Sequence, residues 1–169
     1  MEAAPLILTL GLENAAQARF DALRRQHFPP ERSLVPAHVT LFHDLPGAEG
    51  DAIAEELTLR CAETAPLTVR VAGLRFLGRG VAYALESREL GQLRATLARA
   101  WAPWLTAQDR QGYRPHLTIQ NKASPEAARA LLAALEGEFS AFDVTATGLL
   151  LWHYQGGPWD EAGRFAFRR

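Results

Sequence analysis

One four-residue pattern occurs twice in this chain, as His38-Val39-Thr40-Leu41 and as His116-Leu117-Thr118-Ile119. In a β-strand the side chains of residues i and i+2 leave on the same face, so each copy would place an imidazole and a hydroxyl side by side. The apolar residues between them would point into a core. A proline stands shortly before each copy, and proline is tolerated at the first residue of a strand. Both copies therefore predict the beginning of a strand.

If these two strands lie next to each other, two histidines and two threonines converge on one spot, which suits acid–base chemistry on a phosphate. Histidine, with a reference pKa of about 6.5, can act as base or acid near neutral pH. Threonine hydroxyls would stabilise charge on the phosphate oxygens. The alternative is two ordinary alternating strands, because threonine is common in strands. The repetition favours a function.

The composition is typical of one globular domain spanning residues 1–169, with 48% apolar and 22% charged residues. Cys61 is the only cysteine, which excludes an intramolecular disulfide and a cysteine metal cluster. No apolar run approaches the roughly 20 residues of a membrane span, and no basic leader is seen at Met1–Pro5. We therefore expect a cytoplasmic monomer without a membrane partner.

The formal net charge is −1, from 18 basic and 19 acidic side chains. A protein that binds long nucleic acid is usually basic, so long duplexes are not expected as partners. A nucleic-acid substrate would be short: a nucleotide or the end of an RNA strand, held through one or two phosphates.

The order of predicted elements indicates an α+β domain with antiparallel sheets and helices on the outside. Helix caps are predicted at Asn14, Asp51, Ser87 and Ser124. A weak internal echo suggests two lobes related by a pseudo-two-fold axis, with a central cleft carrying both motif strands. The predicted strands cover residues 5–12, 38–45, 67–77, 81–86, 116–121, 142–154 and 159–168, and the predicted helices cover 15–28, 51–63, 87–102 and 124–135.

With these residues in view, the chain resembles the two-histidine phosphoesterases, in the branch of the bacterial RNA 2′,3′-cyclic phosphodiesterases, also called 2′-5′ RNA ligases. The segments that carry the resemblance are VPAHVTLFHDLPG (35–47), YRPHLTIQNK (113–122), the hairpin VAGLRFLGRGVAYALES (71–87), LILTLGL (6–12) and LLLWHYQGGPW (149–159). The similarity covers nearly the whole chain. It implies a bilobal α+β fold with a central cleft.

The resemblance also implies roles for the matching residues. His38 would donate a proton, His116 would accept one, and Thr40 and Thr118 would bind the phosphate oxygens. No metal and no cofactor are implied, and the two histidines have no carboxylate or cysteine at ligand spacing.

Two basic residues near the second motif are candidate substrate ligands. Many RNA-active members of the family have an arginine close behind a motif, whereas here Lys122 is the nearest cation after the second motif and Arg114 the nearest before it.

Three aromatic residues are candidate substrate contacts. Tyr113 and Trp152 could stack on a nucleobase. Phe42 shares the predicted face of His38 at i+4 and could lie at the cleft edge. His43, at an odd offset from His38, is predicted on the opposite face as a structural or rim residue.

The arginines around the predicted hairpin, Arg75, Arg79 and Arg88, have two interpretations. They could form a basic patch beside the cleft or a solvated loop. Glu86 and Glu89 lie among them, which favours the loop.

These observations predict a metal-independent phosphodiesterase that hydrolyses a 2′,3′-cyclic phosphate on an RNA end or a small nucleotide. The alternatives are a non-catalytic nucleotide-binding module of the same fold and an RNA ligase.

Overall fold

The computed structural model describes residues 3–30 and 35–169, so the start of the expected N-terminal segment, residues 1–2, lies outside the described part. The strands are β1 (Leu6–Leu12), β2 (Thr40–Leu45), β3 (Leu67–Phe76), β4 (Val81–Glu86), β5 (His116–Gln120), β6 (Phe142–His153) and β7 (Asp160–Ala166). The helices are α1 (Asn14–His27), α2 (Gly50–Ala62), α3 (Arg88–Ala100) and α4 (Pro125–Glu136), with short 3-10 turns at Gly47–Glu49 and Ala102–Trp104. The α+β class is confirmed.

All the described strand pairs are antiparallel and belong to one sheet, in the order β2-β1-β6-β3-β4-β5, with β7 also paired to β6. The strands form a single sheet and not the separate sheets that we expected. The reason is that β6 is long enough to pair with several neighbouring strands. Its first half pairs with β3, and its second half pairs with both β1 and β7. The two-lobed arrangement with a pseudo-two-fold axis stays a prediction.

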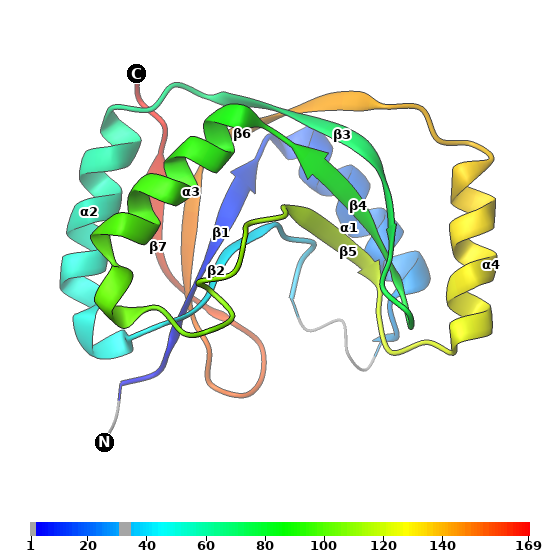
Figure 1. Ribbon diagram of the computed structural model, residues 1–169, viewed down its shortest axis with the longest axis horizontal. Coiled ribbons are helices and arrows are strands. Elements are labelled where there is room, and N and C mark those ends of the chain that lie inside the picture. Colours follow the sequence, from blue (N-terminus) through cyan, green and yellow to red (C-terminus); the bar gives the residue numbers. More distant parts are fainter. Residues whose placement is uncertain (1–2, 31–34) are drawn as a thin grey trace.

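The sheet curls into an arch whose outside carries the helices (Figure 1). Helix α2 contacts β7, α4 packs against β3 and β4, and α1 lies along β5. Apolar side chains of the sheet and of the helices form one core cluster. It includes Leu8, Phe20, Leu57, Leu97 and Trp101, all nearly inaccessible to solvent. Among the described residues, no helix has the length and apolarity required to cross a bilayer.

Two of the four predicted helix caps are confirmed. Ser87 and Ser124 accept hydrogen bonds from the backbone N–H groups of Leu90 and Ala127. The other two predictions are wrong, because each helix begins one residue earlier than predicted and the expected cap is already helical. Asn14 is the first residue of α1, and Asp51 is the second residue of α2.

Candidate active site

The two edge strands of the curled sheet meet at the repeated motifs. Val39, just before β2, forms an antiparallel bridge with Leu117 of β5. The strand predicted at residues 38–45 therefore begins at Thr40, two residues later than expected, with Val39 as an isolated pairing point. Val39 and Leu117 are both fully buried. Because strand side chains alternate between faces, the residues on either side of this pair leave on the opposite face. We call this junction the seam.

Four polar side chains surround the seam: His38, Thr40, His116 and Thr118, each of them half-buried. Neighbours of a facing antiparallel pair lie opposite each other in reversed order. His38 therefore lies across from Thr118, and Thr40 lies across from His116. The fold brings together the four residues that the sequence singled out, with imidazole and hydroxyl alternating around one small area.

Both motif histidines are held in the same way. The Nδ1 atom of His38 lies 2.9 Å from the carbonyl oxygen of Pro36, and that of His116 lies 3.0 Å from the carbonyl oxygen of Arg114. A carbonyl oxygen only accepts hydrogen bonds, so each Nδ1 carries a hydrogen and donates it. The Nε2 atoms are then the ones left for proton transfer.

The pKa values of both motif histidines lie below the usual value of histidine. Burial lowers the pKa of His38 to about 4, and the positive charges of Arg24, His43 and His116 act in the same direction. Burial also lowers the pKa of His116, with a further contribution from Arg75. A bound phosphate would supply the opposite charge and raise both pKa values.

Helix α1 fixes the backbone on both sides of the seam. Gln17 Nε2 donates to the carbonyl oxygen of Ala37 (2.8 Å), and Asp21 accepts the Ala37 N–H (2.8 Å). One turn further on, the buried Arg24 donates to the carbonyl oxygen of Thr118 (2.9 Å). These three side chains recur at helical spacing and so point to one face. They hold the chain just before His38 against the second motif.

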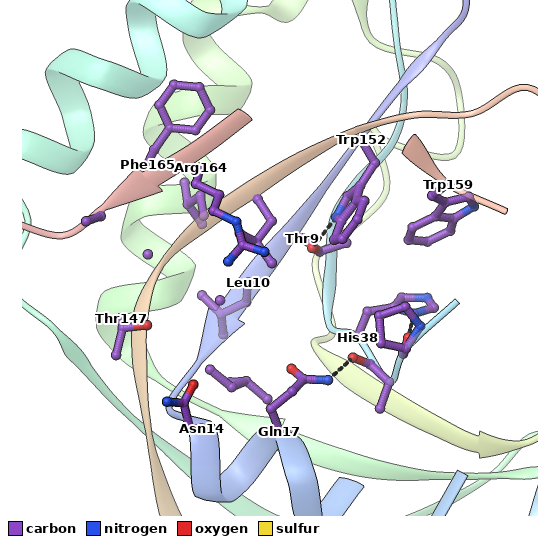
Figure 2. Close-up of a pocket in the computed structure, with 18 residues that line it drawn as sticks. Thr9, Leu10, Asn14, Gln17, His38, Thr147, Trp152, Trp159, Arg164 and Phe165 are labelled. Atoms are coloured by element: carbon purple, nitrogen blue, oxygen red, sulfur yellow. Dashed lines mark hydrogen bonds between the residues drawn. The ribbon is translucent and has the colours of Figure 1, made fainter. Parts of the chain in front are cut away.

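A cavity of about 360 Å³ opens on the His38 side of the seam and is aromatic in character (Figure 2). The Trp159 ring lies 4.6 Å from the His38 ring and 6.0 Å from the Trp152 ring, measured between centroids. Trp152 is fixed by a hydrogen bond from Nε1 to the Thr9 hydroxyl (2.9 Å). Arg164 also lines this cavity. Trp152 was a candidate from sequence, whereas Trp159 and Arg164 were not.

A second cavity of about 370 Å³ opens on the His116 side and is cationic. It is lined by Thr40, Leu41, His43, Arg75, Arg94, Gln108, Asp109, Gln111, Gly112, Tyr113, Arg114 and His116. Arg114 and Tyr113, both candidate substrate contacts from the sequence, line this cavity, and the Tyr113 hydroxyl donates to the carbonyl oxygen of Thr40 (2.9 Å). Lys122 lies beyond the end of β5 and lines neither of these two cavities.

Arg75 reaches the site instead of lying on the solvated loop that we favoured. In the sheet, Arg75 is opposite Ala82, which is opposite Thr118, and the next row places Ala84 opposite His116. The small alanines of β4 leave space above the sheet. The guanidinium Nη1 of Arg75 crosses this space to within 3.3 Å of His116 Nδ1.

The predictions for Phe42 and His43 are reversed. Phe42 is fully buried in the core, where its ring lies 5.2 Å from that of Trp101, so it cannot form the cleft edge. His43 is exposed and lines the cationic cavity. The cause is a pair of register shifts between β1 and β2, at each of which β2 has one extra residue. A bulge interrupts strict alternation and turns the following side chains to the other face.

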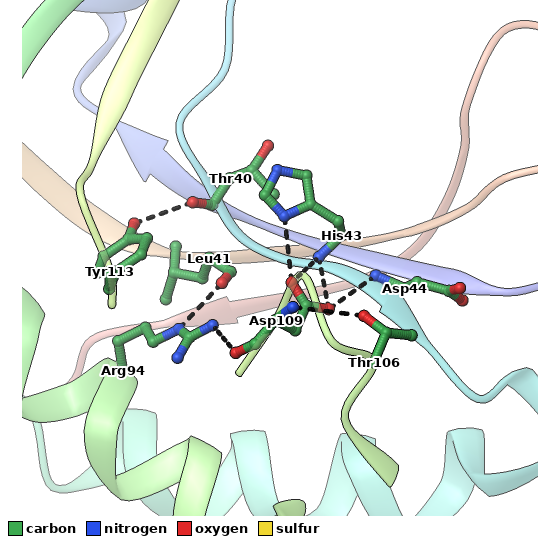
Figure 3. A network of polar contacts seen from close by, with 8 residues as sticks. All are labelled: Thr40, Leu41, His43, Asp44, Arg94, Thr106, Asp109 and Tyr113. Atoms are coloured by element: carbon green, nitrogen blue, oxygen red, sulfur yellow. Dashed lines mark hydrogen bonds and ion pairs between the residues drawn. The ribbon is translucent and has the colours of Figure 1, made fainter. Parts of the chain in front are cut away.

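His43 is anchored by Asp109, a residue that sequence reasoning missed. Asp109 Oδ1 lies 3.1 Å from His43 Nδ1, and its carboxylate also accepts the backbone N–H groups of His43 and Asp44 at 2.9–3.0 Å (Figure 3). Burial alone would raise the pKa of Asp109, but these hydrogen bonds outweigh it and the pKa is lowered. The carboxylate is therefore ionised, and the polar loop before the second motif gave no signal of this pairing.

No group of three or more histidine, cysteine, aspartate or glutamate side chains is arranged to hold a metal ion in the described parts of the chain. The buried Cys61 lies in the core, where burial raises the pKa of its thiol to about 12.

Comparison with known proteins gives one family and one fold. A family model described as the 2′-5′ RNA ligase superfamily matches residues 12–158. A crystal structure of TT0787 from Thermus thermophilus is 18% identical, with a TM-score of 0.66, over 97% of this chain and 98% of that one. E. coli LigT complexed with 3′-AMP is 21% identical, with a TM-score of 0.58, over 99% and 100% of the two chains. LigT complexed with ATP is 18% identical, with a TM-score of 0.60, over all of both chains. No curated protein sequence matches.

Proposed function

The chain belongs to the 2′-5′ RNA ligase superfamily, and from this premise we propose that it is a metal-independent phosphodiesterase acting on a 2′,3′-cyclic phosphate. The substrate is an RNA end or a small nucleotide. The observation that carries the proposal is the seam, where the pairing of Val39 with Leu117 places His38 across from Thr118 and Thr40 across from His116.

The chemistry needs one proton removed and one supplied. His116 Nε2 takes a proton from a water molecule, whose oxygen forms the new bond to phosphorus. His38 Nε2–H gives its proton to the 3′-oxygen as the phosphorus–oxygen bond breaks. The products are a 2′-phosphate and a free 3′-hydroxyl, and one water is consumed. Thr40 and Thr118 donate hydrogen bonds to the remaining phosphate oxygens, where negative charge gathers.

The donor must hold a proton before it can act, although burial lowers the pKa of His38 to about 4. The substrate provides this condition itself, since a phosphate beside an imidazole favours its charged form. Because His38 gains its proton when the substrate binds, proton transfer takes place only when the substrate is in the site.

The aromatic cavity supports a nucleoside as the group attached to the phosphate. Trp152 and Trp159 offer two ring faces directly beside His38, and base stacking on such rings contributes about 1–3 kcal/mol. The LigT structures with 3′-AMP and ATP agree with a nucleotide-type ligand in this fold.

The test is incubation with the four nucleoside 2′,3′-cyclic phosphates and short oligomers in EDTA, followed by mass spectrometry and phosphorus NMR. We expect a mass gain of one water and a 2′-phosphate product. Activity that appears only with added metal, or no turnover of any member, would refute the proposal. Tight calorimetric binding of AMP or CMP without any product would identify a nucleotide-binding module instead.

A further inference from the structure

The two cavities beside the seam differ in charge. The one on the His38 side has one arginine, Arg164, in a mostly apolar lining, whereas the one on the His116 side is lined by Arg75, Arg94 and Arg114 in addition to His43. A scissile phosphodiester carries one negative charge and is already served by the seam. The second cavity therefore holds more positive charge than one phosphate requires.

Its one acidic lining residue, Asp109, offsets only one of the three guanidinium charges, and it is not accessible to a ligand. Asp109 is only 1% exposed, and its oxygens are occupied by His43 Nδ1 and by two backbone N–H groups. Arg94 is likewise occupied by protein groups, donating to the carbonyl oxygens of Leu41 and Asp109. The groups available to a ligand are the other two arginines and His43.

Asp109 also orients the His43 ring. The carboxylate is ionised and accepts from Nδ1, so the remaining ring nitrogen, Nε2, points away from Asp109 (Figure 3). Nearly half of the His43 side chain is accessible, and the ring lies close enough to His38 and His116 to influence the charge on both. A second phosphate near the seam would meet a preoriented nitrogen in a cavity that Arg75 and Arg114 also line.

We propose that His43, Arg75 and Arg114 form a subsite for a second phosphate of the substrate, next to the one that is cleaved. The inference rests on the proposed function and narrows the substrate to nucleotides with a further phosphate. A 5′-terminal monophosphate and the phosphodiester of the preceding nucleotide share this chemistry.

The experiment measures binding and not turnover, so it gives an answer whether or not cyclic phosphates are hydrolysed. Calorimetry compares adenosine 2′-monophosphate with adenosine 2′,5′-bisphosphate, and a third probe, the dinucleotide ApA with a terminal 2′-phosphate, reports on a diester. We expect the second phosphate to tighten binding at least about tenfold, as a charge-assisted hydrogen bond typically does.

The variants His43→Gln and Arg114→Gln should each reduce this gain to less than about threefold, while the matched control His27→Gln, at the far end of α1, should retain it. Thermal melting confirms that each variant is folded. Tighter binding of adenosine 2′,5′-bisphosphate would assign the subsite to a 5′-monophosphate, and tighter binding of the dinucleotide would assign it to a phosphodiester. Equal binding of the one- and two-phosphate probes to the unmodified protein would overturn the inference, as would a gain that survives both substitutions.

Discussion

At the scale of single residues, three imidazoles near the seam share one arrangement. In each, Nδ1 faces an oxygen acceptor, which is a carbonyl for His38 and His116 and the Asp109 carboxylate for His43. Fixing one nitrogen sets the ring orientation and leaves Nε2 for the substrate. The sequence pointed to the first two histidines because their motifs repeat. The third has no repeated context, and nothing in the sequence indicated its pairing with Asp109.

The lowered pKa values of the two motif histidines predict a difference between two pH profiles. The profile of kcat/KM reports the free protein, where the pKa of His38 is about 4 and that of His116 is also lowered. The profile of kcat reports the complex, in which the phosphate raises both. Activity is lost at low pH when the base is protonated and at high pH when the acid is deprotonated. The optimum of kcat should therefore lie at higher pH than that of kcat/KM.

Initial rates over about pH 4 to 9, a range that brackets the reference histidine pKa, will test this. A kcat optimum at the same pH as the kcat/KM optimum, or at lower pH, would contradict the account of how the substrate controls protonation.

At the scale of elements, most strands and helices could be predicted from apolar periodicity and turn residues, but the face of individual side chains could not. The reading of β2 assumed strict alternation, and two bulges in β2 reversed Phe42 and His43. Arg75 was misjudged for another reason. Its approach to His116 depends on the register across β3, β4 and β5, which is set by pairing between distant segments.

The close backbone approach between the paired strands β6 and β7 gives a prediction for Gly148. A Cβ at this position would overlap the carbonyl oxygen of Phe165, which belongs to the backbone and cannot move aside easily. The substitution Gly148→Ala should lower the free energy of unfolding by about 1–3 kcal/mol, as overpacking typically does. The matched control is Gly91→Ala on the exposed side of α3, where a Cβ meets no other atom. It should be neutral or stabilising by up to about 1 kcal/mol.

Urea denaturation of both variants gives the comparison. Equal stability of Gly148→Ala and the unmodified protein would show that β7 can move away from β6 without cost.

At the scale of the whole molecule, curling of one sheet brings together two motifs that are far apart in the chain. The edge strands β2 and β5 have four other strands between them in the sheet order, yet they meet at Val39 and Leu117 (Figure 1). Sequence alone predicted that the motifs would converge, but not that closure of the sheet would achieve it.

The net charge of −1 limits the number of substrate phosphates that the protein can neutralise, and so the length of RNA that it can bind. With contacts to two phosphates, the salt dependence of binding should have a slope of at most about 1.4, since each neutralised phosphate of a single strand contributes about 0.7. A decamer and a dinucleotide with the same cyclic-phosphate end should bind with nearly equal affinity. Titrations at several salt concentrations will test this. A slope above about two, with much tighter binding of the decamer, would reveal a longer RNA-binding surface.

The central claim is that the seam performs acid–base catalysis, and kcat/KM on a nucleoside 2′,3′-cyclic phosphate in EDTA tests it most directly. Replacing either histidine, as His38→Ala or His116→Ala, should reduce kcat/KM by about a hundredfold or more, the usual contribution of a general acid or base. Thr40→Val and Thr118→Val should lose less, because each removes one hydrogen bond to the phosphate. The melting temperatures of all four variants should lie within a few degrees of that of the unmodified protein. Near-normal kcat/KM in a folded His38→Ala or His116→Ala variant would contradict the account.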